Sequence, residues 1–183
     1  MSGEPDVEGL IGVVVPAGGR SSRFGGDKAA APFGDGTVLD HLLRRLGRLG
    51  VPVRLVGPEV PGGPVPAIAA GLTALPGPDD ALVAVVAGDQ PFAADALPLL
   101  VAALRAAPQQ EAAVGVDAGG RDQPLLAVYR RGPLRVALGA AAAGGRVRDV
   151  VARLRVERVP VGEASLDVDT PADLRRALHL LAP

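Results

Sequence analysis

The chain has 183 residues, a length that fits a single domain able to bury its own hydrophobic core. It contains no cysteine, which excludes disulfide frameworks, thiolate zinc sites and cysteine nucleophiles. The formal net charge is −1, with 19 basic and 20 acidic residues, so the composition argues against a nucleic-acid partner and favours a small-molecule ligand.

The N-terminal residues 1–9 are polar and acidic, and we expect them to form a disordered tail. Leu10–Val15 is a short, continuous apolar run, which is typical of a parallel strand covered on both faces. This run is too short to span a bilayer, and no basic segment precedes it. We therefore expect no membrane association and a cytoplasmic location.

Helical and strand-like patterns alternate along the rest of the chain. A helix is expected after Thr37, because leucines recur there at helical spacing while His41 falls on the outer side. Further helices are expected at about 67–75, 94–107, 133–143 and 146–154, and after the N-cap residue Thr170. Further strands are expected at 51–56, 81–87, 112–116, 125–129 and 155–159, with a hairpin turn at 117–120. The alternation predicts one Rossmann-like α/β domain over residues 1–183, with a mostly parallel sheet and helices on both faces.

A glycine-rich segment follows the first expected strand, at the sheet edge where ligands of open α/β sheets bind. Its glycines allow backbone amides to approach phosphate oxygens, and its cations add positive charge. These features favour a triphosphate or pyrophosphate site over a surface turn. The residues expected to bind the nucleotide are Pro16, Ala17, Gly18, Gly19, Arg20, Ser21, Gly25 and Lys28, with Gly57 and Asp89 from later strand ends.

Two aspartates follow at positions suited to a metal ion. Asp89 comes directly after the apolar strand 81–87, at the same sheet edge as the glycine-rich segment. Asp169 precedes the last helix, whose N-cap is Thr170. Mg²⁺ prefers a few carboxylate oxygens together with substrate phosphates and water. A turn or capping role is the alternative for both aspartates. For Asp167 the sequence favours metal binding and a turn or capping role equally.

The segment from Ala17 to Lys28 matches neither a Walker loop nor a dinucleotide-binding loop. It resembles the signature A-G-G-x-S-x-R-(M/F)-G-x-D-K of MobA-like nucleotidyltransferases. This resemblance implies a fold like that of nucleotide-diphospho-sugar transferases. It also implies the activity of a molybdenum cofactor guanylyltransferase, which transfers GMP from GTP to the phosphate of molybdopterin and releases pyrophosphate.

The same resemblance implies roles for individual residues. Asp89 matches the family's metal position, and Asp169 matches a polar position that would supply a second Mg²⁺ ligand. Lys28 and Arg23 would neutralise charge on the pyrophosphate, which makes them catalytic together with Asp89. Residues 121–124 match weakly on the acceptor side, where a solvated surface position is an equal alternative for Arg121.

The sequence leaves open which nucleobase the nucleotide substrate carries. Gly26-Asp27-Lys28 favours the guanylyltransferase branch, whereas Asp89-Gln90-Pro91 and Asp167–Asp169 favour the cytidylyltransferase branch. The segment 57–62 lacks the acidic residue usual in the family, so Glu59 or nearby carbonyls would accept the guanine hydrogen bonds. The alternatives are a CTP-using molybdopterin cytidylyltransferase, a sugar-phosphate nucleotidylyltransferase and a non-catalytic nucleotide-binding or cofactor-delivery protein.

Overall fold

A six-stranded sheet forms the centre of the computed structural model, which describes residues 6–17, 28–141 and 144–181. Its strand order is β4-β1-β5-β7-β6-β8. The strands are β1 (Leu10–Pro16), β4 (Val53–Val56), β5 (Leu82–Val86), β6 (Ala112–Val116), β7 (Asp122–Arg130) and β8 (Val156–Pro160). β7 runs antiparallel to β5 and β6, whereas the other neighbouring strands pair in parallel. The prediction of a mostly parallel sheet is confirmed.

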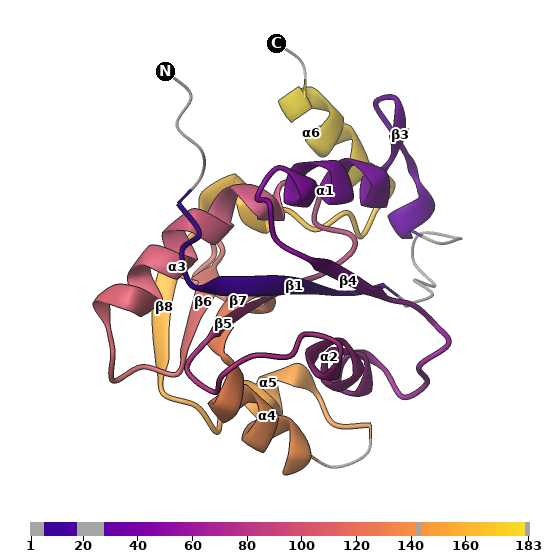
Figure 1. The fold of residues 1–183 in the computed structure, drawn as a ribbon. Coiled ribbons are helices and arrows are strands. Elements are labelled where there is room, and N and C mark those ends of the chain that lie inside the picture. Colours follow the sequence, from indigo (N-terminus) through magenta and orange to yellow (C-terminus); the bar gives the residue numbers. More distant parts are fainter. Residues whose placement is uncertain (1–5, 18–27, 142–143, 182–183) are drawn as a thin grey trace.

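Helices cover both faces of this sheet, as expected (Figure 1). One face carries α1 (Val38–Gly47) and α3 (Leu97–Ala106); the other carries α2 (Pro64–Thr73), α4 (Arg131–Gly139) and α5 (Val147–Val151). Successive residues of β1 alternate between these layers, with Val13 and Val15 in one core cluster and Val14 in the other. Within the described ranges, no helix has the length and apolar character needed to cross a membrane.

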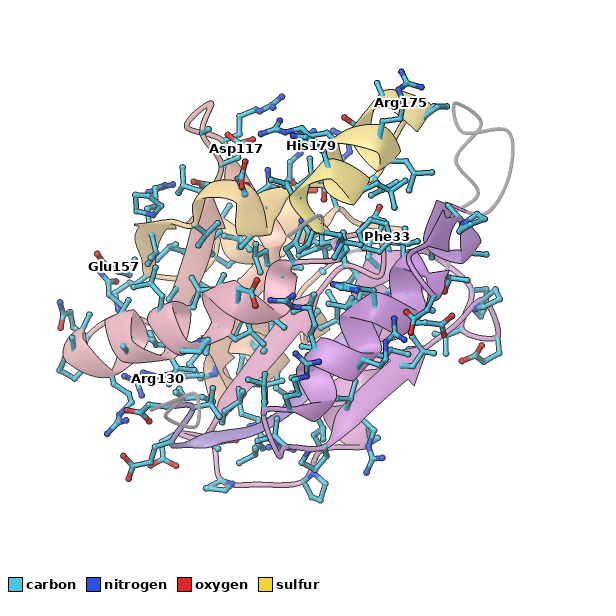
Figure 2. The ribbon with its side chains drawn as sticks, turned by 90° about the horizontal axis from the view of Figure 1, so that it is seen from above. Phe33, Asp117, Arg130, Glu157, Arg175 and His179 are labelled. Carbon is cyan, nitrogen blue, oxygen red and sulfur yellow. The ribbon has the colours of Figure 1, made fainter. Side chains whose placement is uncertain are left out.

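A third, smaller cluster joins the C-terminal helix α6 (Pro171–Leu181) to the rest of the domain. It contains Phe33 from the short hairpin of β2 (Pro32–Phe33) and β3 (Gly36–Thr37), together with Phe92, Val168 and Ala177. Phe33 lies between α1 and α6 (Figure 2). This cluster fixes the chain segment that leads into α6, and that segment carries two of the aspartates discussed below.

Local sequence sets the start of each flanking helix. At α1 the Thr37 hydroxyl accepts a hydrogen bond from the Asp40 amide (3.1 Å), and the Asp40 carboxylate accepts one from the Thr37 amide (2.9 Å). Thr170 and Asp173 form the same pair of bonds at α6, at 3.2 and 2.9 Å, so the expected N-cap is confirmed. Helix α2 begins at Pro64, three residues before its expected start, because proline fits the first helical turn.

The expectation that His41 lies on the outer side of α1 is wrong. Its ring packs edge-on against Phe33 at 5.0 Å and Phe92 at 5.8 Å between ring centroids. Burial, together with the charges of Arg45 and Arg44, holds the pKa of His41 below its usual value. The β2–β3 hairpin supplies Phe33, and strands of two residues leave no periodicity for a sequence pattern to reveal.

The chain before β1 is also more structured than expected. Arg105 on α3 pairs with Glu8 at 2.6 Å and with Asp6 at 3.6 Å, and Val7 packs against the core. The expected disordered tail therefore does not extend to residue 9, because residues 6–9 contact α3 and the adjoining core. Residues 1–5 lie outside the described part of the chain.

Candidate active site

The carboxyl ends of β1, β4 and β5 meet at one edge of the sheet. Pro16 ends β1 opposite Val56, and the Ala17 amide donates a hydrogen bond to the Val56 carbonyl at 2.8 Å. A Cβ added to Gly88 would lie 3.4 Å from the Cβ of Ala17, so the chains leaving β1 and β5 are in close contact. Pro16, Ala17 and the segment containing Asp89, all expected to bind the nucleotide, are thereby brought together.

A second chain segment reaches the same point from the C-terminal part of the domain. The Val168 amide donates a hydrogen bond to the Asp89 carbonyl at 3.0 Å. Val168 is fully buried in the cluster that contains Phe92, so this contact has a fixed position. Asp89 is partly buried and Asp169 is exposed. The backbone bond joins the segments of both expected metal ligands, and Asp167 flanks Val168 on its other side.

Asp89 and Asp169 bring carboxylate groups into the two chain segments that meet at this point. Carboxylate oxygens are ligands that Mg²⁺ accepts, usually one or two per ion alongside phosphate oxygens and water. Among the described residues, no group of three or more acidic, histidine or cysteine side chains is arranged to hold a metal ion. Mg²⁺ binding by Asp89 and Asp169 stays a prediction.

Gly57 and Glu59 lie at the end of β4, next to Ala17. The Gly57 amide donates a hydrogen bond to Glu59 Oε1 at 2.8 Å. A Cβ added to Gly57 would lie 2.5 Å from Glu59 Oε2, so the carboxylate can fold over this position only because residue 57 is glycine. The substitute acceptor considered for guanine thus lies close to the strand ends that converge on the site.

The glycine-rich segment itself lies outside the described residues. This applies to Gly18, Gly19, Arg20, Ser21, Arg23 and Gly25, and also to the side chain of Lys28. The described chain resumes with the backbone of Lys28, the first residue of the 3₁₀ helix η1 (Lys28–Ala30). Contacts between these residues and phosphate groups stay predictions.

A cluster on the turn between β6 and β7 was missed in the sequence. The Asp117 carboxylate, labelled in Figure 2, is only 12% exposed. It accepts hydrogen bonds from the amides of Gly119 (2.8 Å) and Arg121 (3.0 Å), from Arg121 Nε (3.0 Å) and from Gln123 Nε2 (3.1 Å). These bonds, the Arg121 amide foremost, hold the pKa of Asp117 below its usual value. The sequence Asp117-Ala118-Gly119-Gly120 predicted a turn but gave no sign of the bonds to two later side chains.

Comparisons with known proteins agree with this architecture. The family model described as MobA-like NTP transferase domain matches residues 13–159. A molybdenum cofactor guanylyltransferase from Mesorhizobium japonicum is 34% identical, with 93% of this chain and 96% of that protein covered.

Two solved structures share the fold. Molybdopterin-guanine dinucleotide biosynthesis protein A from Archaeoglobus fulgidus aligns with a TM-score of 0.73 at 19% identity, covering 93% of this chain and 98% of that one. The 2-C-methyl-D-erythritol 4-phosphate cytidylyltransferase from Thermus thermophilus aligns with a TM-score of 0.64 at 22% identity and the same two coverages. At these identities the likeness concerns the fold alone.

Proposed function

The chain belongs to the MobA-like NTP transferase family, and from this premise we propose that it transfers GMP from GTP to the phosphate of molybdopterin, releasing pyrophosphate. The observation that carries the proposal is the position of Asp89. Its segment contacts Ala17, which leads into the glycine-rich signature, and its carbonyl binds Val168 between two further aspartates. The chain that leads into the nucleotide loop and the acidic segment therefore both meet the segment that carries Asp89.

The proposed reaction is a displacement at phosphorus. An oxygen of the acceptor phosphate attacks the α-phosphorus of GTP, and a new P–O bond forms. The bond from the α-phosphorus to the bridging oxygen of the β-phosphate breaks, and pyrophosphate leaves with the electron pair. Because the acceptor phosphate is ionised near neutral pH, the protein has to align the reactants and neutralise charge rather than supply a general base.

Each group in the proposal has one task. Asp89 and Asp169 would hold Mg²⁺, which when bound neutralises charge on the phosphate oxygens. Lys28 and Arg23 stabilise the negative charge that grows on the pyrophosphate, and the backbone amides of the glycine-rich segment orient it. The Glu59 carboxylate accepts hydrogen bonds from the N1–H and N2–H₂ donors of guanine.

CTP is the second candidate nucleotide. Asp89-Gln90-Pro91 favours the cytidylyltransferase branch, and the fold is shared with a cytidylyltransferase. A site built for cytosine would not pair the N1–H and N2–H₂ donors of guanine. The two candidates therefore predict opposite preferences between GTP and CTP. A non-catalytic nucleotide-binding role is the third possibility, and it differs in giving no pyrophosphate at all.

The experiment is a pyrophosphate-release assay with molybdopterin as acceptor. GTP, CTP and ATP are compared, each with Mg²⁺ and with a chelator, and the dinucleotide product is identified by mass spectrometry. We expect a guanine dinucleotide and stoichiometric pyrophosphate, both lost with the chelator. Nucleotide binding without pyrophosphate release would instead support the non-catalytic role.

A further inference from the structure

His41 is a half-buried histidine of α1 whose ring packs among aromatic side chains. Phe33 and Phe92 meet it edge-on, with ring centroids at 5.0 and 5.8 Å, and lie 6.1 Å from each other. The Nε2 atom of His41 is buried and has no hydrogen-bond partner among the described residues. A neutral imidazole fits this position when Nε2 carries no proton. Protonation would leave a buried N–H donor there without an acceptor and would add a positive charge.

The cations of α1 oppose a positive charge on His41. Arg45, Arg44 and Arg48 all lie close enough to repel it. The face of Phe92, which could attract a cation, already has the Arg45 guanidinium above it at 5.9 Å from the ring centroid. Burial foremost, and then the charges of Arg45 and Arg44, hold the pKa of His41 below its ordinary value.

The anions that face His41 from neighbouring elements are already paired. Asp95 of η2 (Ala93–Ala96) is bound to Arg45, and Asp35 of the turn between β2 and β3 is bound to Arg44 at 2.6 Å. The side chains that α6 packs against the same cluster are apolar: Leu174, Ala177, Leu180 and Leu181. Of its charged groups, Asp173 caps the first turn and the others are exposed: Arg175, Arg176 and His179. The surroundings of His41 therefore favour its neutral form.

The cluster around His41 also holds the segments of both expected metal ligands. Phe92 comes three residues after Asp89, and Val168, which precedes Asp169, is fully buried in the same cluster. The Val168 amide donates a hydrogen bond to the Asp89 carbonyl at 3.0 Å, a contact that we call the Val168–Asp89 junction. Separation of the cluster would remove the packing that holds this junction in place.

A second contact joins α1 to the same segment. A Cβ added to Gly88 would lie 3.5 Å from Leu39 Cδ1, and Leu39 precedes His41 by two residues on α1. Movement of α1 away from the cluster would therefore also release the residue directly before Asp89.

We propose that neutral His41 is a positioning residue that keeps the Val168–Asp89 junction closed, and that protonation of His41 opens the junction in mildly acidic solution. This inference rests on the proposed function for its effect on turnover, whereas the junction itself is measured without it. Protonation favours the open state, because an exposed histidine binds a proton more tightly than a buried one. The stabilising effect is therefore lost as the pH falls below about 6.5, where an ordinary histidine takes up its proton.

The first test uses NMR on the wild-type protein, which has only two histidines. His179 is exposed on α6 (Figure 2), so His179→Gln is the control variant and its missing signal assigns the other to His41. We expect His41 to titrate at a lower pH than a free histidine. Between about pH 7.5 and 5.5 the hydrogen-exchange protection factor of the Val168 amide should fall at least about fivefold, the lower end of what an unsatisfied buried donor costs. The Val85 amide in β5, outside this cluster, should keep its protection.

The second test uses His41→Phe, which keeps an aromatic ring and removes the titrating group. Its Val168 protection factor should not change over the same pH range. Within each protein, kcat for pyrophosphate release is compared between the two pH values at saturating GTP and acceptor. The acceptor phosphate titrates in this range and affects all the proteins alike. We therefore expect His41→Phe to lose less kcat on acidification than wild type and His179→Gln do.

The outcomes separate this inference from the proposed function. Unchanged Val168 protection while His41 titrates would overturn the inference, and these wild-type data decide the matter even if His41→Phe does not fold. Parallel losses at Val168 and Val85 would also overturn it, because the whole domain would then be opening. The same holds for a loss at Val168 that persists in His41→Phe, or for an equal loss of kcat in all three proteins. Without pyrophosphate release at any pH the proposed function would fail, and exchange at Val168 alone would decide whether His41 controls the junction.

Discussion

Asp89→Asn is expected to lower kcat for pyrophosphate release at least about a hundredfold while leaving the domain folded. The substitution keeps the size of the side chain and the backbone carbonyl that accepts the Val168 amide at 3.0 Å. The segment that carries Asp169 should therefore stay in place. What is lost is the negative charge, and a neutral amide is a poor ligand for Mg²⁺.

The magnitude follows from treating Asp89 as one preorganised electrostatic contact. Removing such a contact costs about 10²–10³ in kcat, equivalent to about 2.7–4 kcal/mol in the activation free energy. Because the side chain is only partly buried and its backbone contact survives, we expect the free energy of unfolding to change by about 1 kcal/mol at most. The substitution should therefore lower kcat strongly while changing the free energy of unfolding little.

Asp79→Asn supplies the matched control, because Asp79 precedes the same strand β5 at the opposite edge of the sheet. It pairs with Arg135 at 3.1 Å and Arg131 at 3.5 Å while remaining 63% exposed, and such surface pairs contribute about 0–1 kcal/mol. Its kcat should match wild type within about twofold. The assay is pyrophosphate release at saturating GTP and acceptor, with circular dichroism to verify folding. A folded Asp89→Asn protein with near wild-type kcat would refute the metal assignment.

Three further predictions concern the phosphate loop, the base and the core. Lys28→Ala should lower kcat about 10²–10³-fold in the same assay, whereas a raised KM alone would show uniform substrate binding instead. Glu59→Ala should reduce the ratio of kcat/KM for GTP to that for CTP, and an unchanged ratio would exclude Glu59 as the guanine acceptor. Gly71→Ala should reduce the free energy of unfolding by about 1–3 kcal/mol in urea titrations, because the added Cβ would lie 2.4 Å from a Val14 methyl. Gly47→Ala, with no atom within 4 Å of the added Cβ, should be neutral or slightly stabilising, and equal losses would contradict the packing explanation.

The strand and helix order could be predicted because each element of the two main layers carries its own apolar pattern. Continuous apolar runs predicted β1 and β5, and the helical spacing of leucines predicted α1. The β2–β3 hairpin could not be predicted in this way, and its Phe33 is what buries the flank of α1 that carries His41. Short elements that depend on tertiary contacts leave too little pattern in the sequence.

The sequence predicted those site residues that come directly after an apolar strand. Asp89 could be assigned to the carboxyl edge of the sheet from sequence alone, because it follows an apolar strand. Its contact with Val168 could not, because the two residues are distant in sequence and meet only when the Phe92 cluster forms. The hydrogen bond from Gln123 to Asp117 depends on the pairing of β7 with β6. The sequence of this segment therefore predicted the turn but not the bond.

The measurement that tests the central claim most directly is kcat/KM for GTP, CTP and ATP with molybdopterin as the single acceptor. A site that pairs the N1–H and N2–H₂ donors of guanine leaves its acceptors unsatisfied with the other bases. We therefore expect kcat/KM for GTP to exceed the values for CTP and ATP by about tenfold or more. A kcat/KM for CTP equal to or above that for GTP would contradict the assignment as a guanylyltransferase.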